Sequence, residues 1–373
     1  MSVQTGEKAE KLQSLDSAGD ASIPSSSNKA RIKIGLVGLN FGRHIVDHLI
    51  SGPASEFFEL TALCDIDRER MAESARKAPV ACYDNLDDIL ADPNVEAVGL
   101  FTKPGGRAKL LEKIVRSGRH VFTTKPLEFD PEAAKSALEE AKTLGMVIHC
   151  NSPGVVPTDD LMLIKKWEQE HSLGHPIAAR AELWASYREV SDGSWYDDPE
   201  SCPAAPVYRL GIYVINDLVR LWGKVDSVQL TQSRIFTQRP TVDNAQLALL
   251  FENKAIANVF ASFCVDDGNP YANSMTLNYE NGTIYRNAGP AWLAADGNSC
   301  RMALVQKRDG QCRIVEEAFV ESKSGAYQWE HFARAIRGEV QLNSLTPDEM
   351  VEGIRVIGSV VKAQRDGGVA KSE

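Results

Sequence analysis

Apolar and polar positions alternate in two rhythms along this chain, and the first rhythm runs from about residue 31 to 151. Short apolar runs of the kind that form buried strands occupy residues 31–38, 58–65, 95–101, 119–124 and 146–151. Amphipathic segments separate them, as in 130-DPEAAKSALEEAKTLG-145, where Asp130 can cap a helix, Pro131 suits its first turn and Gly145 can end it. This alternation predicts a parallel sheet with crossover helices, and about six strands fit before residue 152.

The second rhythm begins beyond residue 175, where the apolar runs become longer and strictly alternating. They occupy residues 177–189, 226–236, 244–252, 255–265 and 274–287, and the pair Asn281-Gly282 is a strong hairpin turn. Helical spacing returns at 206–223, 328–338 and 346–364. We therefore predict a large open antiparallel sheet with one covered face.

These patterns give an α/β plus α+β fold in three segments. Residues 1–30 are polar and Ser-rich and are expected to be a disordered tail. Residues 31–151 form an N-terminal Rossmann domain with a parallel sheet, and residues 152–373 form a C-terminal domain for substrate binding and oligomerisation.

Composition excludes several classes of protein. A chain of 373 residues with 43% hydrophobic residues and a mean hydropathy of -0.25 is typical of a soluble protein with two cores. No apolar run approaches the ~20 residues of a membrane-spanning helix. The net charge of -10 argues against a nucleic-acid partner. Seven scattered cysteines without a C-x-x-C pair favour reduced thiols, no metal site and a cytoplasmic location.

The stretch 35-GLVGLNFGRH-44 joins the first predicted strand to the first predicted helix, where main-chain N–H groups favour a pyrophosphate. Compared with the G-x-G-x-x-G fingerprint, Asn40 replaces the middle glycine and the spacing from Gly38 through Phe41 to Gly42 is one residue short. Because Asn tolerates a left-handed backbone, the turn can survive. The alternative is a plain strand-to-helix turn without a nucleotide.

Asp65 ends the second predicted strand, where an acidic side chain accepts hydrogen bonds from the adenosine ribose of NAD and repels the 2′-phosphate of NADP. NAD is therefore the expected cofactor, with NADP possible because Arg68 or Arg70 could serve a 2′-phosphate. The alternative is a solvated Asp at the start of a turn.

Two further stretches carry a family resemblance. The segment 121-VFTTKPLEFD-130 resembles the E-K-P segment of the glucose-fructose oxidoreductase and inositol dehydrogenase (Gfo/Idh/MocA) family. The segment 209-RLGIYVINDLVRLWG-223 is similar to the D-x-G-x-H-x-x-D helix of that family, in the variant with Tyr and Asn in place of His and the second Asp. The resemblance extends from about residue 31 to 365.

The resemblance implies an NAD(P)-dependent oxidoreductase that transfers a hydride between nicotinamide and a secondary alcohol carbon of a sugar, sugar acid or cyclitol, in a homodimer or homotetramer. It places Lys125 at the nicotinamide ribose and the substrate hydroxyl, and Tyr213 where the family's catalytic His stands. The cofactor-binding residues that it implies, with the glycine-rich turn and Asp65, are Thr102, Lys103, Pro104, Thr124 and Lys125. Expected substrate contacts are Asn151, Arg209, Asn216 and Trp195.

Lys125 and Tyr213 make chemical sense as an acid/base pair. An ordinary Tyr has a pKa near ~10 and is too weakly ionised to act as a base, but a neighbouring ammonium would stabilise its phenolate and move that pKa toward neutrality. The alternatives are a surface Lys that follows a strand and a helix Tyr in the interdomain core.

Departures from the family pattern alter the expected substrate contacts. Thr124 stands where the family has Glu, and Arg209 where it has Asp, four residues before Tyr213 and on the same helix face. One hypothesis is that Arg209 binds a substrate carboxylate or phosphate. Trp195, in the long connection 194–206, could stack on a sugar. The missing carboxylates leave open a dinucleotide-binding sensor or regulator, and a dihydrodiol dehydrogenase is a further alternative.

Overall fold

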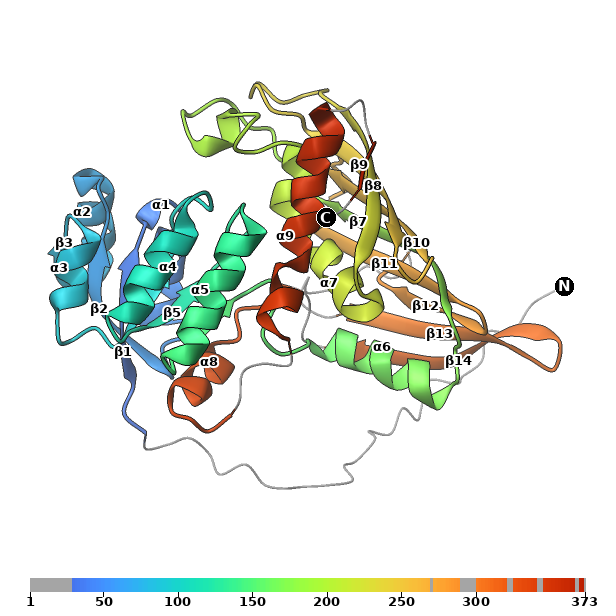
Figure 1. Cartoon of the computed structure of the whole chain (residues 1–373), viewed down its shortest axis with the longest axis horizontal. Helices are drawn as coiled ribbons and strands as arrows, with labels where there is room; N and C mark the ends of the chain where they lie inside the picture. The colour runs from blue at the N-terminus through green and yellow to red at the C-terminus, as the bar shows by residue number, and fades with distance from the viewer. Residues whose placement is uncertain are drawn as a thin grey trace, which may run out of the picture.

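The computed structural model describes residues 29–268, 271–288, 300–320, 325–340, 345–365 and 369–371. Two sheets lie side by side, with the smaller parallel sheet at the N-terminal end of the chain and the larger sheet formed by later strands (Figure 1). The tail predicted at residues 1–30 lies, up to residue 28, outside the described residues.

The first sheet confirms the predicted Rossmann fold. Its six strands are all parallel in the order β3-β2-β1-β4-β5-β6, so the order reverses between β1 and β4. The strands are β1 (Ile32–Val37), β2 (Phe58–Cys64), β3 (Ala81–Tyr83), β4 (Ala97–Leu100), β5 (His120–Thr123) and β6 (Ile148–Cys150). Ligands bind at such a switch point, beyond the carboxyl ends of the strands.

Helices cover both faces of this sheet with separate apolar clusters. One cluster includes residues of α1 (Leu39–Ile50), α2 (Arg68–Lys77) and α8 (Trp329–Ile336). The other includes residues of α3 (Leu86–Ala91), α4 (Arg107–Arg116) and α5 (Pro131–Thr143). Helix α5 begins as predicted, since the Asp130 side chain accepts hydrogen bonds from the N–H groups of Glu132 and Ala133.

Helix α8 belongs by sequence to the second half of the chain but packs on the first sheet. The ring of Trp329 stacks on Phe122 at 4.1 Å between centroids, and Phe332 stacks on Phe58 at 5.4 Å. The boundary predicted after residue 151 stays a prediction: β6 ends at Cys150 and the first strand of the larger sheet begins at Pro176, while α8 packs on the first sheet, a contact that nothing local to α8 reveals.

The second sheet has nine strands in the order β14-β13-β12-β11-β7-β10-β9-β8-β15. It is antiparallel as predicted, except that β7 and β10 pair in parallel. The strands are β7 (Pro176–Trp184), β8 (Val225–Ser233), β9 (Asn244–Phe251), β10 (Ile256–Ser262), β11 (Ala272–Tyr279), β12 (Gly282–Arg286), β13 (Cys300–Arg308), β14 (Gln311–Val320) and β15 (Val369–Lys371). The hairpin of β13 and β14 was not among the predicted strands.

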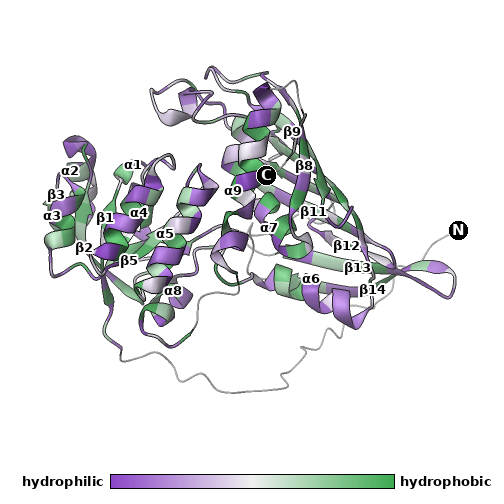
Figure 2. Ribbon diagram, in the orientation of Figure 1, coloured by the Kyte–Doolittle hydropathy of each residue, from purple (hydrophilic) through white to green (hydrophobic). Residues whose placement is uncertain are grey.

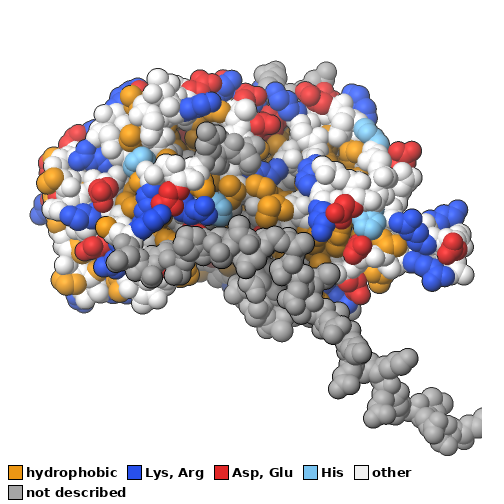
Figure 3. Space-filling view, turned by 90° about the horizontal axis from the view of Figure 1, so that it is seen from below, with side chains coloured by type: hydrophobic (Ala, Val, Ile, Leu, Met, Phe, Trp, Pro, Cys, Tyr) orange, Lys and Arg blue, Asp and Glu red, His pale blue; other side chains and the backbone are white. Residues whose placement is uncertain are grey.

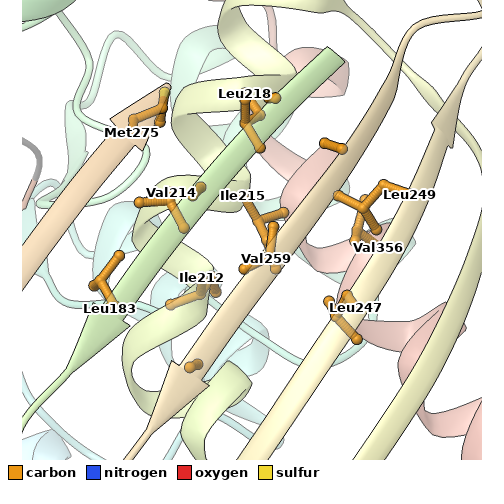
Figure 4. Packing of buried hydrophobic residues seen from close by; sticks show 14 of the residues in the cluster. Leu183, Ile212, Val214, Ile215, Leu218, Leu247, Leu249, Val259, Met275 and Val356 are labelled. Atoms are coloured by element: carbon orange, nitrogen blue, oxygen red, sulfur yellow. The ribbon is translucent and has the colours of Figure 1, made fainter. Parts of the chain in front are cut away.

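One face of the second sheet is covered by α6 (Asp159–Glu170), α7 (Ile212–Trp222) and α9 (Pro347–Arg365), as Figure 1 shows. Ile212, Ile215 and Leu218 of α7 point toward the strands, between side chains such as Leu183 and Val259 (Figure 4). Helix α7 is accordingly hydrophobic over most of its surface, whereas α5 also carries hydrophilic residues (Figure 2).

The helix predicted at residues 206–223 consists of two parts. Its first turn, η2 (Val207–Gly211), is π-helical, and α7 follows it directly. Such wide turns are rare and occur frequently at functional sites. Apolar periodicity could not predict this turn, because the spacing of apolar residues indicates a helix but does not tell a π-helical turn from an α-helical one.

No helix in the described part of the chain has the length and apolar character to cross a membrane. Among the same residues no cluster of His, Cys, Asp and Glu side chains suits a metal ion. On the face drawn in Figure 3, basic and acidic side chains lie scattered over both domains.

Candidate active site

A cavity of about 620 Å³ lies at the carboxyl ends of the parallel strands. Residues that follow β1, β2, β4 and β5 line it on one side. The second domain contributes three aromatic side chains, those of Trp195, Tyr196 and Tyr213. The cavity therefore occupies the switch-point position where a dinucleotide binds in this class of fold.

Gly38 forms the turn between β1 and α1 and has a φ of 86°. A Cβ atom here would lie 2.9 Å from the main-chain carbon of Phe101 and the nitrogen of Thr102, so the turn requires glycine. Asn40 does not adopt the left-handed backbone that the sequence suggested, because α1 already begins at Leu39.

The rest of the glycine-rich turn divides between the cavity and the core. Asn40 and Phe41 line the cavity with Gly38. Gly42 is buried instead, and a Cβ atom there would lie 3.5 Å from the ring of Phe101. This distance is an ordinary van der Waals contact, so the packing of α1 at this position does not require glycine.

Asp65 directly follows β2, and its side chain is buried against the first residue of α1 and lines the cavity. Its Oδ2 accepts a hydrogen bond from the N–H of Leu39 at 2.5 Å, and its Oδ1 accepts one from Asp67 at 2.8 Å. Arg70 also lines the cavity, with Nη1 3.8 Å from Asp65 Oδ2 and Nη2 3.1 Å from Asp67 Oδ2. Both alternatives for the adenosine end, a ribose at Asp65 and a phosphate at Arg70, therefore have a side chain in place.

Thr102, Lys103 and Pro104 line the cavity beyond β4, as expected. The buried Oγ1 of Thr102 has no hydrogen-bond partner among the described residues, which leaves a polar group for a bound molecule. This orphaned hydroxyl and the tight Gly38 turn fit an extended dinucleotide along the strand ends.

Arg107 is a buried residue whose importance the sequence did not reveal. Its guanidinium donates to the main-chain oxygens of Thr102, Thr124 at 2.6 Å and Pro126 at 2.5 Å. Burial lowers its pKa to about 10. Arg107 thereby connects the segment after β4 to the segment that carries Lys125. The sequence signal for this residue was its position directly after Gly105-Gly106.

Lys125 projects from the end of β5 to the second domain. Its Nζ donates a 2.5 Å hydrogen bond to the main-chain oxygen of Arg209 in η2 and lies 4.7 Å from the centre of the Tyr213 ring. Burial, together with the charge of Arg209, lowers its pKa to about 7. Lys125 can therefore exchange a proton near neutral pH.

Tyr213 lies at the cavity, but its ionisation differs from the expectation. Burial raises its pKa well above the ordinary value, and the nearby Tyr271 and Tyr327 raise it further. This direction favours a protonated Tyr213, opposite to the shift toward neutrality that the sequence suggested, because burial disfavours the phenolate.

Asn151 supports these residues from behind the cavity. Its Oδ1 accepts hydrogen bonds from Thr124 Oγ1 at 3.1 Å and from the N–H of Lys125 at 3.0 Å, and its Nδ2 donates to the oxygen of Gly325 at 3.3 Å. Thr124 lines the cavity, whereas Asn151 does not. In this structure Asn151 holds the main chain of Lys125, and the substrate contact expected of Asn151 stays a prediction.

Arg209 does not line the cavity. Its Nη1 and Nη2 donate to both carboxylate oxygens of Glu189 at 2.6 and 2.7 Å, and its guanidinium lies 4.0 Å from the centre of the Tyr196 ring. The hypothesis that Arg209 binds a substrate anion stays a prediction, but in this structure Glu189 already takes the bidentate face of its guanidinium.

Asn216 is also turned away from the cavity. Its Nδ2 donates to Ser152 Oγ at 2.9 Å, and a Cβ atom on Gly353 would lie 1.8 Å from its Oδ1. Asn216 thus packs α7 closely against α9, and the substrate contact expected of it stays a prediction. Trp195, an expected substrate contact, lines the cavity, and so does Tyr196 beside it, which the sequence did not single out.

Comparison with known proteins agrees with this geometry. Residues 32–152 match the model of the oxidoreductase family with an NAD-binding Rossmann fold, and residues 161–285 match the GFO/IDH/MocA C-terminal domain. The chain belongs to this family, as the resemblance implied, and its N-terminal domain is an NAD-binding Rossmann domain.

Curated relatives are distant. An uncharacterized oxidoreductase of Schizosaccharomyces pombe is 29% identical over 175 residues, 46% of this chain and 46% of that protein. The scyllo-inositol 2-dehydrogenase (NADP(+)) IolW of Bacillus subtilis is 25% identical over 222 residues, 58% of this chain and 59% of that protein. The chain thus spans about half the length of the curated relatives that it matches.

Solved structures share the whole fold. The complex of levoglucosan dehydrogenase with NADH has a TM-score of 0.71 at 16% identity, with 92% of this chain and 100% of that chain covered. The WlbA dehydrogenase of Bordetella pertussis, solved with NADH and UDP-GlcNAcA, has a TM-score of 0.67 at 18% identity, with 92% and 99% covered.

Proposed function

We propose that this protein is an NAD(P)-dependent dehydrogenase that oxidises a secondary alcohol of a sugar, sugar acid or cyclitol. The observation that supports this most strongly is the Lys125 amine, whose pKa is about 7 and which lies over the ring of Tyr213 at the end of the cavity. A general base works best when its pKa lies near the working pH.

Neutral Lys125 accepts the proton of the substrate hydroxyl as the C–H bond breaks and a carbonyl forms. Bound NAD supplies the acceptor for the hydride. Tyr213, protonated at neutral pH, donates a hydrogen bond to the substrate oxygen, and Asn151 keeps Lys125 in position through its main-chain N–H. In the reverse direction protonated Lys125 returns the proton.

Gly38, Asn40 and Phe41 are proposed to hold the pyrophosphate side of the cofactor and Asp65 its adenosine ribose. Thr102, Lys103, Pro104 and Thr124, which line the cavity, are proposed to border the nicotinamide half, with the reacting carbon between Lys125 and Trp195. The relative from Bacillus subtilis is named as NADP(+)-dependent, and the neighbouring crystal structures contain NADH, so both nucleotides are candidates.

The test is a spectroscopic assay of the full chain with NAD or NADP and a panel of sugars, cyclitols, sugar acids and an aromatic dihydrodiol. We expect reduced nicotinamide to form with a member of the sugar or cyclitol groups, and Lys125→Ala to abolish this. Lys109→Ala is the matched control, because Lys109 is exposed on α4 and does not line the cavity.

The other outcomes of the assay identify the alternatives. Tight NADH binding without turnover of any panel member would support the sensor or regulator. Turnover of the dihydrodiol alone would support a dihydrodiol dehydrogenase.

We also propose assembly through the uncovered face of the second sheet. Ile256 is 55% exposed there and pairs across strands with Leu250, and Phe260 follows on the same face of β10. Sedimentation analysis should give a dimer or tetramer, and Ile256→Glu should shift it toward the monomer.

A further inference from the structure

The connection between β7 and η2 carries two of the three aromatic side chains that the second domain contributes to the cavity. Trp195 and Tyr196 are adjacent, with ring centroids 4.4 Å apart, and Phe129 lies 6.2 Å from Trp195. The main-chain oxygen of Tyr196 accepts a 3.0 Å hydrogen bond from Thr241 Oγ1, in the connection between β8 and β9. A different loop of the domain thus fixes this pair.

Arg239 in the same β8–β9 connection is the centre of that attachment. Its guanidinium, with the side chain only 6% exposed, uses Nε for Glu189 at 2.9 Å and both Nη atoms for Asp192 at 2.8 and 3.0 Å. Nη1 also donates to Asp197 Oδ1 at 2.7 Å. Asp192 and Asp197 flank Trp195 in the sequence, so one guanidinium holds the loop on both sides of this ring.

Arg209 completes the arrangement from η2. It shares Glu189 with Arg239, and its guanidinium packs on Tyr196 at 4.0 Å. Arg209, Arg239, Glu189, Asp192 and Asp197 are called the arginine clamp below.

Both guanidiniums of the arginine clamp form ion pairs with its carboxylates and so do not present a positive charge to a substrate. The clamp contains two guanidiniums and three carboxylates. Hydrogen bonding to Arg239 holds the pKa of Asp192 well below its usual range. Burial alone would raise the pKa of Glu189, but both arginines outweigh burial and lower it. With all five groups ionised, the clamp carries one net negative charge.

Among the described residues that line the cavity, positive charge is confined to the first domain. Their cationic side chains, those of Arg70, Lys103, Arg107 and Lys125, all come from the first domain, where the cofactor is proposed to bind. The described lining from the second domain is aromatic and uncharged at neutral pH.

We propose that the arginine clamp holds Trp195 and Tyr196 as a fixed aromatic wall that selects an uncharged polyol ring, with Arg239 as the positioning residue. This inference rests on the proposed function and narrows its substrate class from sugar, sugar acid or cyclitol to the neutral members. The aliphatic C–H face of such a ring packs against the wall, while its hydroxyls point to Lys125. A carboxylate or phosphate on the ring is disfavoured by the excess negative charge behind the wall.

The experiment compares Arg239→Gln with Arg234→Gln in the full chain. Arg234 lies in the same β8–β9 connection but is exposed, and the change of charge is identical. Because Arg239→Gln leaves Arg209 as the one cation of the arginine clamp beside three carboxylates and could unfold the loop, Asp192→Asn is a milder second variant: Asp192 is 53% exposed and loses only its charge. Measured quantities are KM and kcat for a neutral polyol and for the matching sugar acid, and the Kd of NADH.

Wild type should prefer the neutral substrate. Arg239→Gln should raise the KM for the neutral polyol by about 10- to 100-fold, since a small misplacement of a group that positions the substrate can lower activity by up to about 100-fold. Asp192→Asn should move KM in the same direction by less, whereas Arg234→Gln should match wild type. The Kd of NADH should change less than about twofold in all three variants. A wild-type KM in Arg239→Gln, or a wild-type preference for the acid, would overturn the proposal.

Limited chymotrypsin digestion separates this inference from the proposed function. Trp195 and Tyr196 are themselves cleavage sites, so a released wall should be cut faster in Arg239→Gln than in Arg234→Gln. If the wild type turns over no substrate, the proposed function fails, and equal digestion of the two variants would then overturn the clamp independently.

Discussion

The amine of Lys125 lies over the face of the Tyr213 ring, with Nζ 4.7 Å from the ring centre. The π face attracts an ammonium, but burial disfavours the charge more strongly, and the pKa of Lys125 falls to about 7. Burial also disfavours a phenolate, which raises the pKa of Tyr213. The two shifts support the proposal that Lys125, rather than Tyr213, exchanges the proton near neutral pH.

The first prediction concerns pH. Above about pH 7 Lys125 is neutral and can accept a proton, and below it the amine is charged. Polyol oxidation should therefore rise with pH to a plateau with a midpoint near 7, and carbonyl reduction should fall over the same range. Initial rates at saturating cofactor measure both profiles. Lys125→Ala should lower the plateau by about 100- to 10,000-fold and remove this midpoint.

The second prediction separates Tyr213 from Lys125. Tyr213→Phe keeps the ring under the amine but removes the hydroxyl, so kcat should fall by about 100-fold, as for loss of one donor to the reacting oxygen. The midpoint near 7 should remain, because Lys125 is still present. Tyr208→Phe is the control, since Tyr208 is buried but does not line the cavity. If the midpoint near 7 is absent from the pH profile of Tyr213→Phe, the titrating group is Tyr213 and not Lys125.

The third prediction concerns the adenosine end. Arg70 lines the cavity, whereas Arg68 does not and pairs with Asp84 at 2.5 Å. Arg70→Ala should weaken NADPH binding by about tenfold, the loss of a guanidinium contact worth ~1.4 kcal/mol, and leave NADH nearly unchanged. Arg68→Ala is the matched control and should affect neither nucleotide. Fluorescence titrations measure all four affinities, and equal losses of NADH and NADPH in Arg70→Ala would contradict a phosphate contact.

Features that depend on neighbouring residues could be predicted from the sequence. The parallel strands follow from local apolar runs, and the Asp130 cap of α5 from the residues beside it. Lys125 and Tyr213 could be brought together only through the family resemblance, since they come from different domains.

The direction of a side chain could not be predicted where its partner is distant. Arg209 turns from the cavity because Glu189, 20 residues earlier, receives its guanidinium and is shared with Arg239. Asn216 packs against Gly353 of α9, a contact that no spacing in α7 encodes. The raised pKa of Tyr213 has the same origin, because its burial depends on residues distant in the sequence, such as Tyr271 and Tyr327.

The last prediction concerns Gly325, which touches Tyr213 from another segment. Gly325 has a φ of +87°, and a Cβ atom there would lie 2.6 Å from Cε1 of the Tyr213 ring. Gly325→Ala should therefore displace the ring and lower kcat by about 100-fold, since small misplacements in a reacting site cost this much. NADH binding should persist, because Gly325 does not line the cavity.

Gly338→Ala is the matched control for this change. Gly338 has a φ of +70° with nothing within 4 Å of the added Cβ, so it suffers the same backbone penalty without the clash. Gly338→Ala should lose about 1–2 kcal/mol of stability in denaturant unfolding, the backbone cost alone, and Gly325→Ala should lose at least as much, but only Gly325→Ala should lose turnover. Equal kcat values in the two variants would mean that the position of the Tyr213 ring does not limit the reaction, and Lys125 would then act without it.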